Sequence, residues 1–257
     1  MVEVRQDDGG ECVTRRSAVI RVFFLRSGER FVNVLRENEL KTIVILSGGL
    51  DSTTLLYHLK AEGHEVHALT FDYGQRHKRE LAAAAEVCQL TATSQEIVDL
   101  TALAPLFGSN ALTDHSVDLP EGEYSEETIS VSTVPNRNMI MLSVALGRAI
   151  SLGFDAVAFG AHGGVNDVMY PDCSPEFAAA MNGVAKVCDE HDLTVLAPFV
   201  QWEKSDIVKR GGELKVPFEV TWSCYDGDDT PCGNCGTCVD RRNGFATAGL
   251  LDPAISG

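Results

Sequence analysis

The sequence predicts an α/β fold, in which a doubly wound parallel sheet is followed by a cysteine-rich segment near the C-terminus. From Lys41 onward, short apolar runs rich in β-branched residues alternate with longer helical patterns, as in parallel strands joined by crossover helices. Four of the eight cysteines crowd into residues 224–238. Hydrophobic residues make up 44% of the 257 residues and charged residues 23%, which are values of a globular chain.

The strands and helices can be placed in order from residue 41. Thr42–Leu46 (TIVIL) is wholly apolar and predicts a buried parallel strand. Asp51–Ala61 predicts the first helix, with its leucines on one face. We expect further strands at 65–71, 95–98, 156–159 and 194–197, and further helices at 78–89, 138–150, 175–189, 203–210 and 239–248. Residues 104–135 are rich in Ser, Thr, Pro, Gly and Glu and are expected to form a long irregular connection.

The first 40 residues differ from the rest and are expected to be an N-terminal extension. Their hydrophobic residues show no clear helical or strand periodicity, although a short strand or hairpin around 19–25 and 30–35 is possible. Two explanations stay open, a dispensable extension and a translation start placed too early, and we favour the first.

The chain is strongly acidic, with a net charge of −16, all of it carried by residues 41–257. Such a charge disfavours nucleic acid as a direct partner, because phosphate contacts need Lys and Arg. A halophilic source and an ordinary acidic cytosolic protein explain it equally well. Neither a membrane span nor a signal peptide is readable, so we expect a cytoplasmic protein whose thiols stay reduced.

A glycine-rich loop follows the first predicted strand directly and opens the first helix. It reads Ser47-Gly48-Gly49-Leu50-Asp51-Ser52-Thr53. The glycines permit close approach of the backbone to an anion, and the helix N-terminus supplies N–H donors. Asp51 suits a Mg²⁺ ion placed between its carboxylate and phosphates, whereas the alternative is that Asp51 or Ser47 caps the helix.

The four clustered cysteines predict a metal site. Cys224, Cys232, Cys235 and Cys238 have the spacing C-x₇-C-x₂-C-x₂-C, and four thiolates suit one structural Zn²⁺ ion. An iron–sulfur cluster is the alternative. We therefore divide the chain into an extension (1–40), a nucleotide-binding α/β domain (41–220), and a zinc-binding segment with a C-terminal helix (221–257). Cys88 and Cys188 are expected to be core or neutral residues within helices.

The glycine-rich loop resembles the SGGxDS[ST] loop of the PP-loop ATP pyrophosphatases, which have an adenine nucleotide alpha hydrolase-like fold. Further strings narrow the resemblance: residues 71–77 (FDYGQRH), 134–138 (VPNRN), 170–173 (YPDC), 221–225 (TWSCY) and 241–245 (RRNGF). Together they resemble the 7-cyano-7-deazaguanine synthase family, over about residues 41–250. The resemblance implies an ATP-dependent carbon–nitrogen ligase that converts 7-carboxy-7-deazaguanine and ammonia to 7-cyano-7-deazaguanine, a precursor of queuosine and archaeosine. An activated carboxylate and an amide would be intermediates, and a homodimer would be compatible with the family.

Single residues also have expected roles. Arg137, which stands in a matched string, would bind the substrate carboxylate or the phosphates, or else form an ion pair at a helix start. Asp72 and Arg76 lie at the carboxyl end of a predicted strand, where contacts to the nucleotide are expected. Asp172 would recognise the guanine-like edge, or else cap the helix that begins at Pro175. Lys204 would neutralise negative charge on ATP, or else be a surface lysine at a helix start. The expected ATP-binding stretch is Leu46, Ser47, Gly48, Gly49, Leu50, Asp51, Ser52, Thr53, Thr54, Leu55 and Leu56.

Two rival functions remain open on the sequence alone. One is another PP-loop adenylating enzyme, such as a tRNA thiolase or an amidotransferase-like enzyme. The net charge of −16 disfavours tRNA, and the C-terminal cysteines are expected to bind metal rather than to act in catalysis. The other is a relative without catalytic activity that only binds nucleotide.

Overall fold

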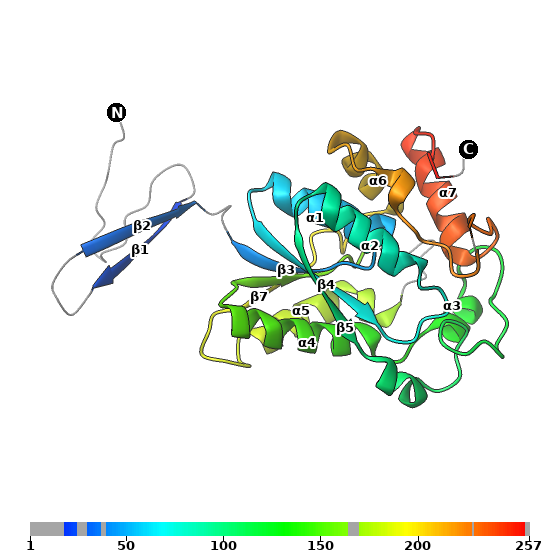
Figure 1. The fold of residues 1–257 in the computed structure, drawn as a ribbon, viewed down its shortest axis with the longest axis horizontal. Coiled ribbons are helices and arrows are strands. Elements are labelled where there is room, and N and C mark those ends of the chain that lie inside the picture. Colours follow the sequence, from blue (N-terminus) through cyan, green and yellow to red (C-terminus); the bar gives the residue numbers. More distant parts are fainter. Residues whose placement is uncertain (1–17, 25–29, 37–39, 164–169, 228, 255–257) are drawn as a thin grey trace.

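In the computed structural model, a central sheet of five parallel strands lies between two layers of helices (Figure 1). The structure describes residues 18–24, 30–36, 40–163, 170–227 and 229–254. The strand order is β5-β4-β3-β6-β7, so the chain winds outward from β3 first on one side and then on the other. The predicted fold class is confirmed. The strands are β3 (Lys41–Ile45), β4 (Glu65–Asp72), β5 (Ser94–Asp99), β6 (Ala156–Ala158) and β7 (Thr194–Leu196).

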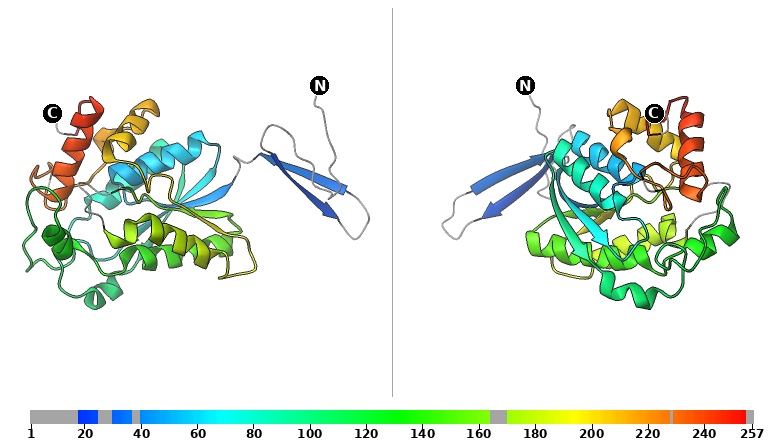
Figure 2. Two further views of the ribbon diagram at one scale, coloured as in Figure 1. Left: turned by 180° about the vertical axis from the view of Figure 1, so that it is seen from behind. Right: turned by 45° about the vertical axis from the view of Figure 1, so that its right-hand side comes forward.

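The helices cover both faces of this sheet, and each face has its own core. On one face α1 and α2 pack on β3 and β4, and on the other α4 and α5 pack on the strands, as two further views show (Figure 2). Neighbouring strand residues alternate between the two cores, because Ile43 belongs to one and Val44 to the other. The helices are α1 (Leu50–Ala61), α2 (Arg79–Leu90), α3 (Glu126–Ser132), α4 (Arg137–Leu152), α5 (Pro175–Ala185), α6 (Lys204–Glu213) and α7 (Gly236–Ala248), with 3₁₀ turns η1 (Thr101–Phe107), η2 (Pro171–Cys173) and η3 (Phe218–Val220).

The N-terminal region contains a two-stranded antiparallel sheet of its own. Its strands are β1 (Ala18–Phe24) and β2 (Arg30–Arg36), close to the hairpin that the sequence allows. Residues 1–17, 25–29 and 37–39 of the expected extension lie outside the described residues. Among the described residues, no helix combines the length and the apolar character that crossing a bilayer requires.

Three sequence-based expectations about elements were wrong. The connection 104–135 is not wholly irregular, because a capping box between Ser125 and Thr128 starts α3 within it. The helix predicted at 175–189 ends at Ala185, so Cys188 lies beyond it and is exposed. The last helix begins at Gly236 rather than at residue 239, and its first turn therefore carries Cys238.

Candidate active site

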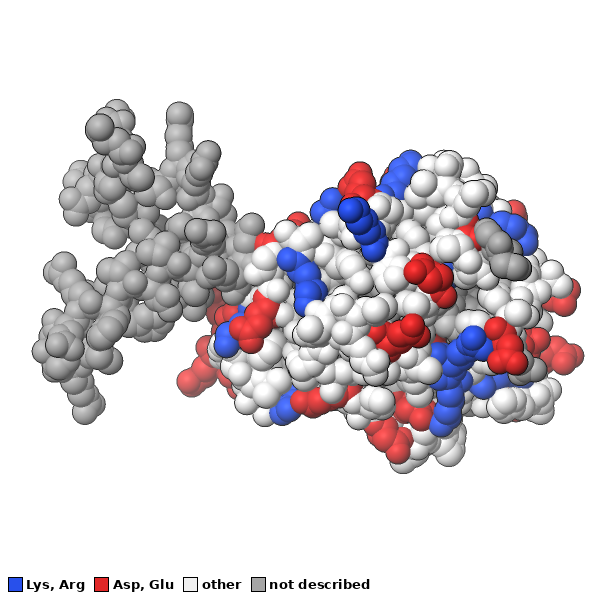
Figure 3. All heavy atoms as spheres, turned by 45° about the horizontal axis from the view of Figure 1, so that its top comes forward, with Lys and Arg blue, Asp and Glu red and all other residues white. Residues whose placement is uncertain are grey.

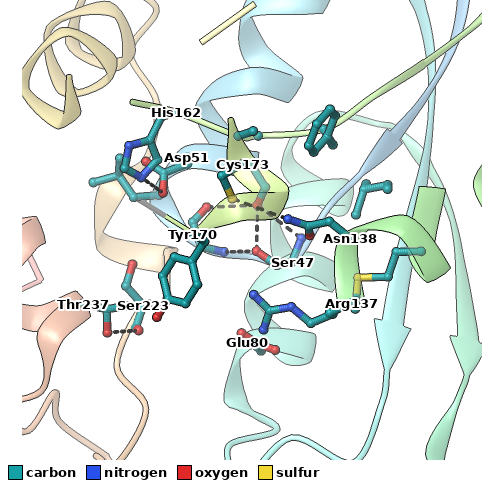
Figure 4. A pocket seen from close by; sticks show the side chains of 18 of the residues that line it. Ser47, Asp51, Glu80, Arg137, Asn138, His162, Tyr170, Cys173, Ser223 and Thr237 are labelled. Carbon is teal, nitrogen blue, oxygen red and sulfur yellow. Dashed lines mark hydrogen bonds and ion pairs between the residues drawn. The ribbon is translucent and has the colours of Figure 1, made fainter. Parts of the chain in front are cut away.

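A cavity of about 270 Å³ opens at the carboxyl ends of the parallel strands. It lies where the strand order reverses, between the loop after β3 and the segment after β6, which is where open α/β sheets bind ligands. At this point the backbones are close: a Cβ at Gly160 would lie 3.3 Å from the nitrogen of Ser52. Side chains from α4, from residues 170–173 and from the C-terminal segment complete the wall (Figure 4).

The glycine-rich loop forms one side of the cavity with its helix N-terminus uncapped. Gly49 is the N-cap of α1 and has no side chain that could accept from the first turn; Ser47 Oγ accepts a hydrogen bond from the amide of Gly49 at 3.2 Å, and Asp51 does not act as the cap. Gly48 has φ +87°, and a Cβ there would lie 2.2 Å from the carbonyl oxygen of Glu80. The loop is therefore packed directly on α2, and only glycine fits at this position.

The predicted ATP-binding stretch divides into two parts. Six of its first seven residues line the cavity: Leu46, Ser47, Gly49, Leu50, Asp51 and Ser52. Hydroxyl groups order the loop, since Ser52 Oγ lies 3.0 Å from Ser47 Oγ and 3.2 Å from the amide nitrogen of Ser47. The last four residues are fully buried in the α1 packing and are not among the described residues that line the cavity: Thr53, Thr54, Leu55 and Leu56.

Lys204 ties the glycine-rich loop to the C-terminal segment. Its Nζ donates to both carboxylate oxygens of Asp51, at 2.7 and 2.9 Å, and lies 2.9 Å from Asp240 Oδ2. Although it is the first residue of α6, its side chain is only 11% exposed, so it is not a surface lysine. Burial lowers the pKa of Lys204, but Asp240 and Asp51 outweigh burial and raise it, which keeps the ammonium group charged.

The same ion pair keeps Asp51 ionised. Burial alone would raise the pKa of Asp51, but the charge of Lys204 and the hydrogen bond from its ammonium group hold it below its ordinary value. The imidazole of His162 lies 3.8 Å from Asp51 Oδ2, and burial, together with Lys204, lowers the pKa of His162. This end of the cavity therefore carries a fixed ammonium, two carboxylates and a neutral imidazole.

Arg137 lies at the other end of the cavity, with a half-buried carboxyl group, that of Glu80, opposite. Its Nη1 donates to the Tyr73 hydroxyl at 2.9 Å, and its guanidinium lies 5.4 Å from the centre of the Tyr73 ring. Figure 4 shows the Glu80 side chain facing Arg137. Burial raises the pKa of Tyr73 to about 12 and that of Glu80 to about 7, although Arg137 opposes both shifts.

The structure brings Asp51, Arg137 and Lys204 to the cavity but places the other three predicted residues elsewhere. Asp72, Arg76 and Asp172 are not among the described residues that line it. Asp72 pairs with Lys78 at 2.8 Å, while Arg76 donates to the carbonyl oxygens of Asp114 and Val117.

Asp172 sits behind the wall of the cavity and caps a helix. Its Oδ2 accepts from the amide of Asn138 in the first turn of α4, at 3.2 Å. The helix that begins at Pro175 is capped instead by Ser174, whose Oγ accepts from the amide of Phe177. Asp172 therefore acts on the segment that carries Arg137.

Several cavity residues were missed by the sequence analysis. Glu80 and Asp240 stand close to strings that were recognised, three residues after His77 and two after Cys238. Tyr124 comes from the connection that was expected to be irregular. The missed wall residues with reactive or aromatic side chains are Glu80, Tyr124, His162, Tyr170, Cys173, Tyr225 and Asp240.

The four predicted cysteines converge on one point beside the cavity. The sulfur atoms of Cys224, Cys232, Cys235 and Cys238 all lie within 4.8 Å of one another. The amides of Asp226, Gly227 and Cys232 point at Cys224 Sγ, at 3.0–3.4 Å. Four sulfurs at this spacing, with N–H donors that stabilise thiolate charge, fit a single tetrahedral metal ion.

The cysteine segment also contacts the glycine-rich loop. The amide of Trp222 donates to the carbonyl of Gly48 at 2.9 Å, and Asp240, two residues after Cys238, holds Lys204. Gly244 lies against Lys204, so closely that a Cβ there would be 2.4 Å from Lys204 Cγ. The cysteine segment is thus part of the cavity's framework.

A comparison with models of protein families shows to which family the chain belongs. The model described as "Queuosine biosynthesis protein QueC" matches residues 41–249. The chain belongs to the QueC family. Curated relatives named 7-cyano-7-deazaguanine synthase support the assignment. That of Chromohalobacter salexigens is 42% identical over 231 residues, covering 89% of this chain and 92% of the relative. That of Brucella ovis is 47% identical over 216 residues, covering 83% and 92%.

Solved structures similar to this QueC family member are more distant. A 4-thiouridine synthetase in complex with RNA and ATP has a TM-score of 0.46 at 17% identity, covering 86% of this chain and 52% of that one. The NMN synthetase of Francisella tularensis has a TM-score of 0.44 at 15% identity, covering 83% and 79%.

Proposed function

We propose that this chain is a 7-cyano-7-deazaguanine synthase, an ATP-dependent ligase that converts 7-carboxy-7-deazaguanine and ammonia to the nitrile. The observation that carries the proposal is the QueC match over residues 41–249, because this range includes every described residue that lines the cavity. A carboxylate resists attack by ammonia until its oxygen becomes a good leaving group. Transfer of AMP from ATP to that oxygen supplies the leaving group.

The two ends of the cavity suit the two substrates. The glycine-rich loop, with its uncapped helix N-terminus and the charged Lys204, would bind the phosphates of ATP. Arg137 would bind the substrate carboxylate, since a guanidinium matches a carboxylate in a bidentate manner. The enzyme's share in the reaction is then mostly positioning and charge stabilisation.

Two metal ions belong to this proposal. A structural zinc ion would be held by Cys224, Cys232, Cys235 and Cys238, where a closed shell of four thiolates leaves no position for substrate. Asp51 is the residue that would hold the Mg²⁺ of ATP, which shields the charge of the phosphates. A cytoplasmic location completes the proposal, because a reducing compartment keeps the four thiols available to the metal.

Mass spectrometry tests the activity directly. Purified protein is incubated with Mg-ATP, ammonium and 7-carboxy-7-deazaguanine, and the nitrile product is measured. We expect the nitrile only when the acid, ATP and ammonium are all present. Folded protein with its metal bound that forms neither amide nor nitrile would exclude this activity.

A further inference from the structure

We propose that Glu80 is the catalytic base of the nitrogen chemistry, taking up the N–H protons when ammonia is added and again when the amide is dehydrated. This inference rests on the proposed function and concerns the same cavity. It assigns the steps that follow each activation by ATP.

The geometry holds the Glu80 carboxylate at the end of the cavity where the substrate carboxylate would lie. Its Oε1 accepts from Gln75 Nε2 at 2.9 Å, and Gln75 is itself fixed by the carbonyl of Phe71 and the amide of Tyr73. Among the described residues, no other hydrogen-bond donor lies within reach of the carboxyl group. The group is therefore oriented by one contact and faces Arg137 across the cavity (Figure 4).

The other titratable groups of the cavity are less suited to this role. The carboxylates of Asp51 and Asp240 are both within 2.9 Å of Lys204 Nζ, so each is already paired with an ammonium group. In contrast, within the described residues no Lys, Arg or His nitrogen lies within 4.0 Å of Glu80, so its carboxylate is not neutralised by a salt bridge. His162 stands beside Asp51, at the end proposed for the phosphates. Of the described carboxylates and histidines that line the cavity, Glu80 is the one that faces Arg137, where the carbon–nitrogen bond would form.

The surroundings of Glu80 also bring the pKa of its carboxyl group close to neutral pH. Burial raises its pKa to about 7, while Arg137 on α4 and the hydrogen bond from Gln75 lower it and Asp72 at the end of β4 raises it. A general base works best when its pKa is near the working pH. Near neutral pH, Glu80 can accept a proton in one step and release it to water in the next.

The first proton transfer accompanies amide formation. The lone pair of ammonia attacks the carbonyl carbon of the acyl adenylate, and a C–N bond forms. Glu80 takes one N–H proton, the C–O bond to AMP breaks, and AMP leaves with the electron pair. The amide remains in the cavity, and Glu80 returns its proton to solvent.

The second round removes both remaining N–H protons. The amide oxygen attacks the α-phosphorus of a second ATP, and pyrophosphate leaves. Glu80 accepts the nitrogen's two protons one after the other, passing the first to water before it takes the second. The C–O bond breaks, AMP leaves with the amide's oxygen, and the carbon–nitrogen triple bond remains.

Partial reactions of Glu80→Gln test the inference, because this variant keeps the size of the side chain and an oxygen for Gln75. Adenylation is followed as acid-dependent exchange of labelled pyrophosphate into ATP, without ammonia. We expect this exchange to be unchanged in Glu80→Gln, while amide formation falls about 100-fold or more. Hydroxylamine should still trap the adenylate as the hydroxamate. At constant free ammonia, the rise of the wild-type rate through a pH of about 7 should be lost.

A matched control lies on the same helix. Glu86 is exposed on α2, and Glu86→Gln should leave exchange, amide formation and nitrile formation unchanged. Amide formation at the wild-type rate in Glu80→Gln would overturn the inference, and so would a parallel loss of exchange and amide formation. Failure of the proposed function looks different, since the wild-type protein would then show neither acid-dependent exchange nor nitrile.

Discussion

A single ammonium group, that of Lys204, organises the end of the cavity that the glycine-rich loop forms. It is shared by two carboxylates, Asp51 after β3 and Asp240 in α7, which are far apart in the sequence. Removal of Lys204 would leave these two carboxylates without a counter-charge. Because a buried charge without a partner costs several kcal/mol, the protein would be destabilised. The lysine therefore has a structural task in addition to the proposed one toward ATP.

The raised pKa of Glu80 predicts a pH-dependent effect on stability. The folded protein holds this proton more tightly than the unfolded chain, in which the pKa is near 4.5. The contribution of the Glu80 proton to the stability of the fold is therefore fully present below about pH 4.5 and is lost as the pH rises through about 7. We expect the stability of Glu80→Gln relative to the wild type to be greater at pH 8 than at pH 5 by on the order of 2 kcal/mol.

Urea unfolding at the two pH values measures this difference. Glu86→Gln, on the exposed side of α2, serves as the control and should show no pH-dependent gain. A Glu80→Gln protein that is equally destabilised at both pH values would contradict the assigned pKa.

The sequence identified cavity residues that lie next to recognisable backbone features and missed most of the others. Ser47 and Asp51 were predicted because a Gly-Gly turn stands between a strand and a helix. Glu80 and Asp240 were missed because they enter the cavity only through tertiary packing, Glu80 through the contact of its carbonyl with Gly48. The same limitation applies to Asp72 and Arg76: a position at a strand's carboxyl end does not decide which way the side chain turns.

At the scale of elements, the packing of α7 on α6 fixes the position of Lys204. The contact depends on Gly244, where a Cβ would overlap Lys204 Cγ at 2.4 Å. We expect Gly244→Ala to displace Lys204 from Asp51 and Asp240, to destabilise the protein by about 1–3 kcal/mol and to lower turnover at least tenfold.

A glycine with free space around it provides the comparison. Gly183 lies in α5, and a Cβ there meets nothing within 4 Å. Gly183→Ala should leave turnover unchanged and stabilise the fold by about 0.5–1 kcal/mol. Equal turnover of Gly244→Ala and Gly183→Ala would show that the close contact does not position the lysine.

Metal removal should affect more than the cysteine segment. We expect Cys235→Ser to lose bound metal and to unfold at a lower temperature, because the remaining sulfurs no longer close a tetrahedral shell. ATP should also bind more weakly, since Trp222 and Asp240 of this segment contact Gly48 and Lys204.

Metal analysis, thermal unfolding and ATP titration of the same preparations check this prediction. Cys188→Ser is the control, because Cys188 is an exposed free thiol that is not one of the clustered cysteines. One zinc ion per chain and an unchanged melting temperature in Cys235→Ser would argue against a structural four-cysteine site.

The element boundaries show why the sequence succeeded with the sheet and failed in the long connection. Runs of apolar and β-branched residues such as Thr42–Leu46 occur where both faces of a strand are covered, so they were recognised. Residues 126–132 (EETISVS) contain mainly poor helix formers, and α3 starts there because Ser125 and Thr128 form a capping box. A local hydrogen-bond arrangement of this kind has only a weak signature in the sequence.

For the whole molecule, the net charge of −16 predicts a strong dependence on salt. Figure 3 shows acidic and basic side chains interspersed on the face that it draws, so the excess charge is not confined to one patch there. We expect the melting temperature to rise as KCl increases from about 0.02 to about 1 M, because screening relieves the repulsion between carboxylates. A lower melting temperature at high KCl would contradict this expectation.

The proposed division of the chain predicts that the N-terminal extension (1–40) is dispensable. The central sheet begins with β3 at Lys41, and the carbonyl of Leu40 accepts a hydrogen bond from the amide of Glu65 at 3.0 Å. A chain that starts at Glu39 keeps this bond and the whole cavity. We expect it to show full turnover and the same unfolding midpoint as the full chain, and a loss of either would assign the extension a role.

The bridge from Asp51 through Lys204 to Asp240 has a consequence for the chain while it is being synthesised. A ribosome delivers the glycine-rich loop early, but Trp222, the four cysteines and Asp240 emerge among the last residues. Until then Lys204 lacks its second carboxylate, and the cysteine cluster is incomplete. A chain whose translation stops before residue 240 therefore carries the glycine-rich loop and Lys204 without Asp240, one of the two carboxylates that hold the lysine in the full chain.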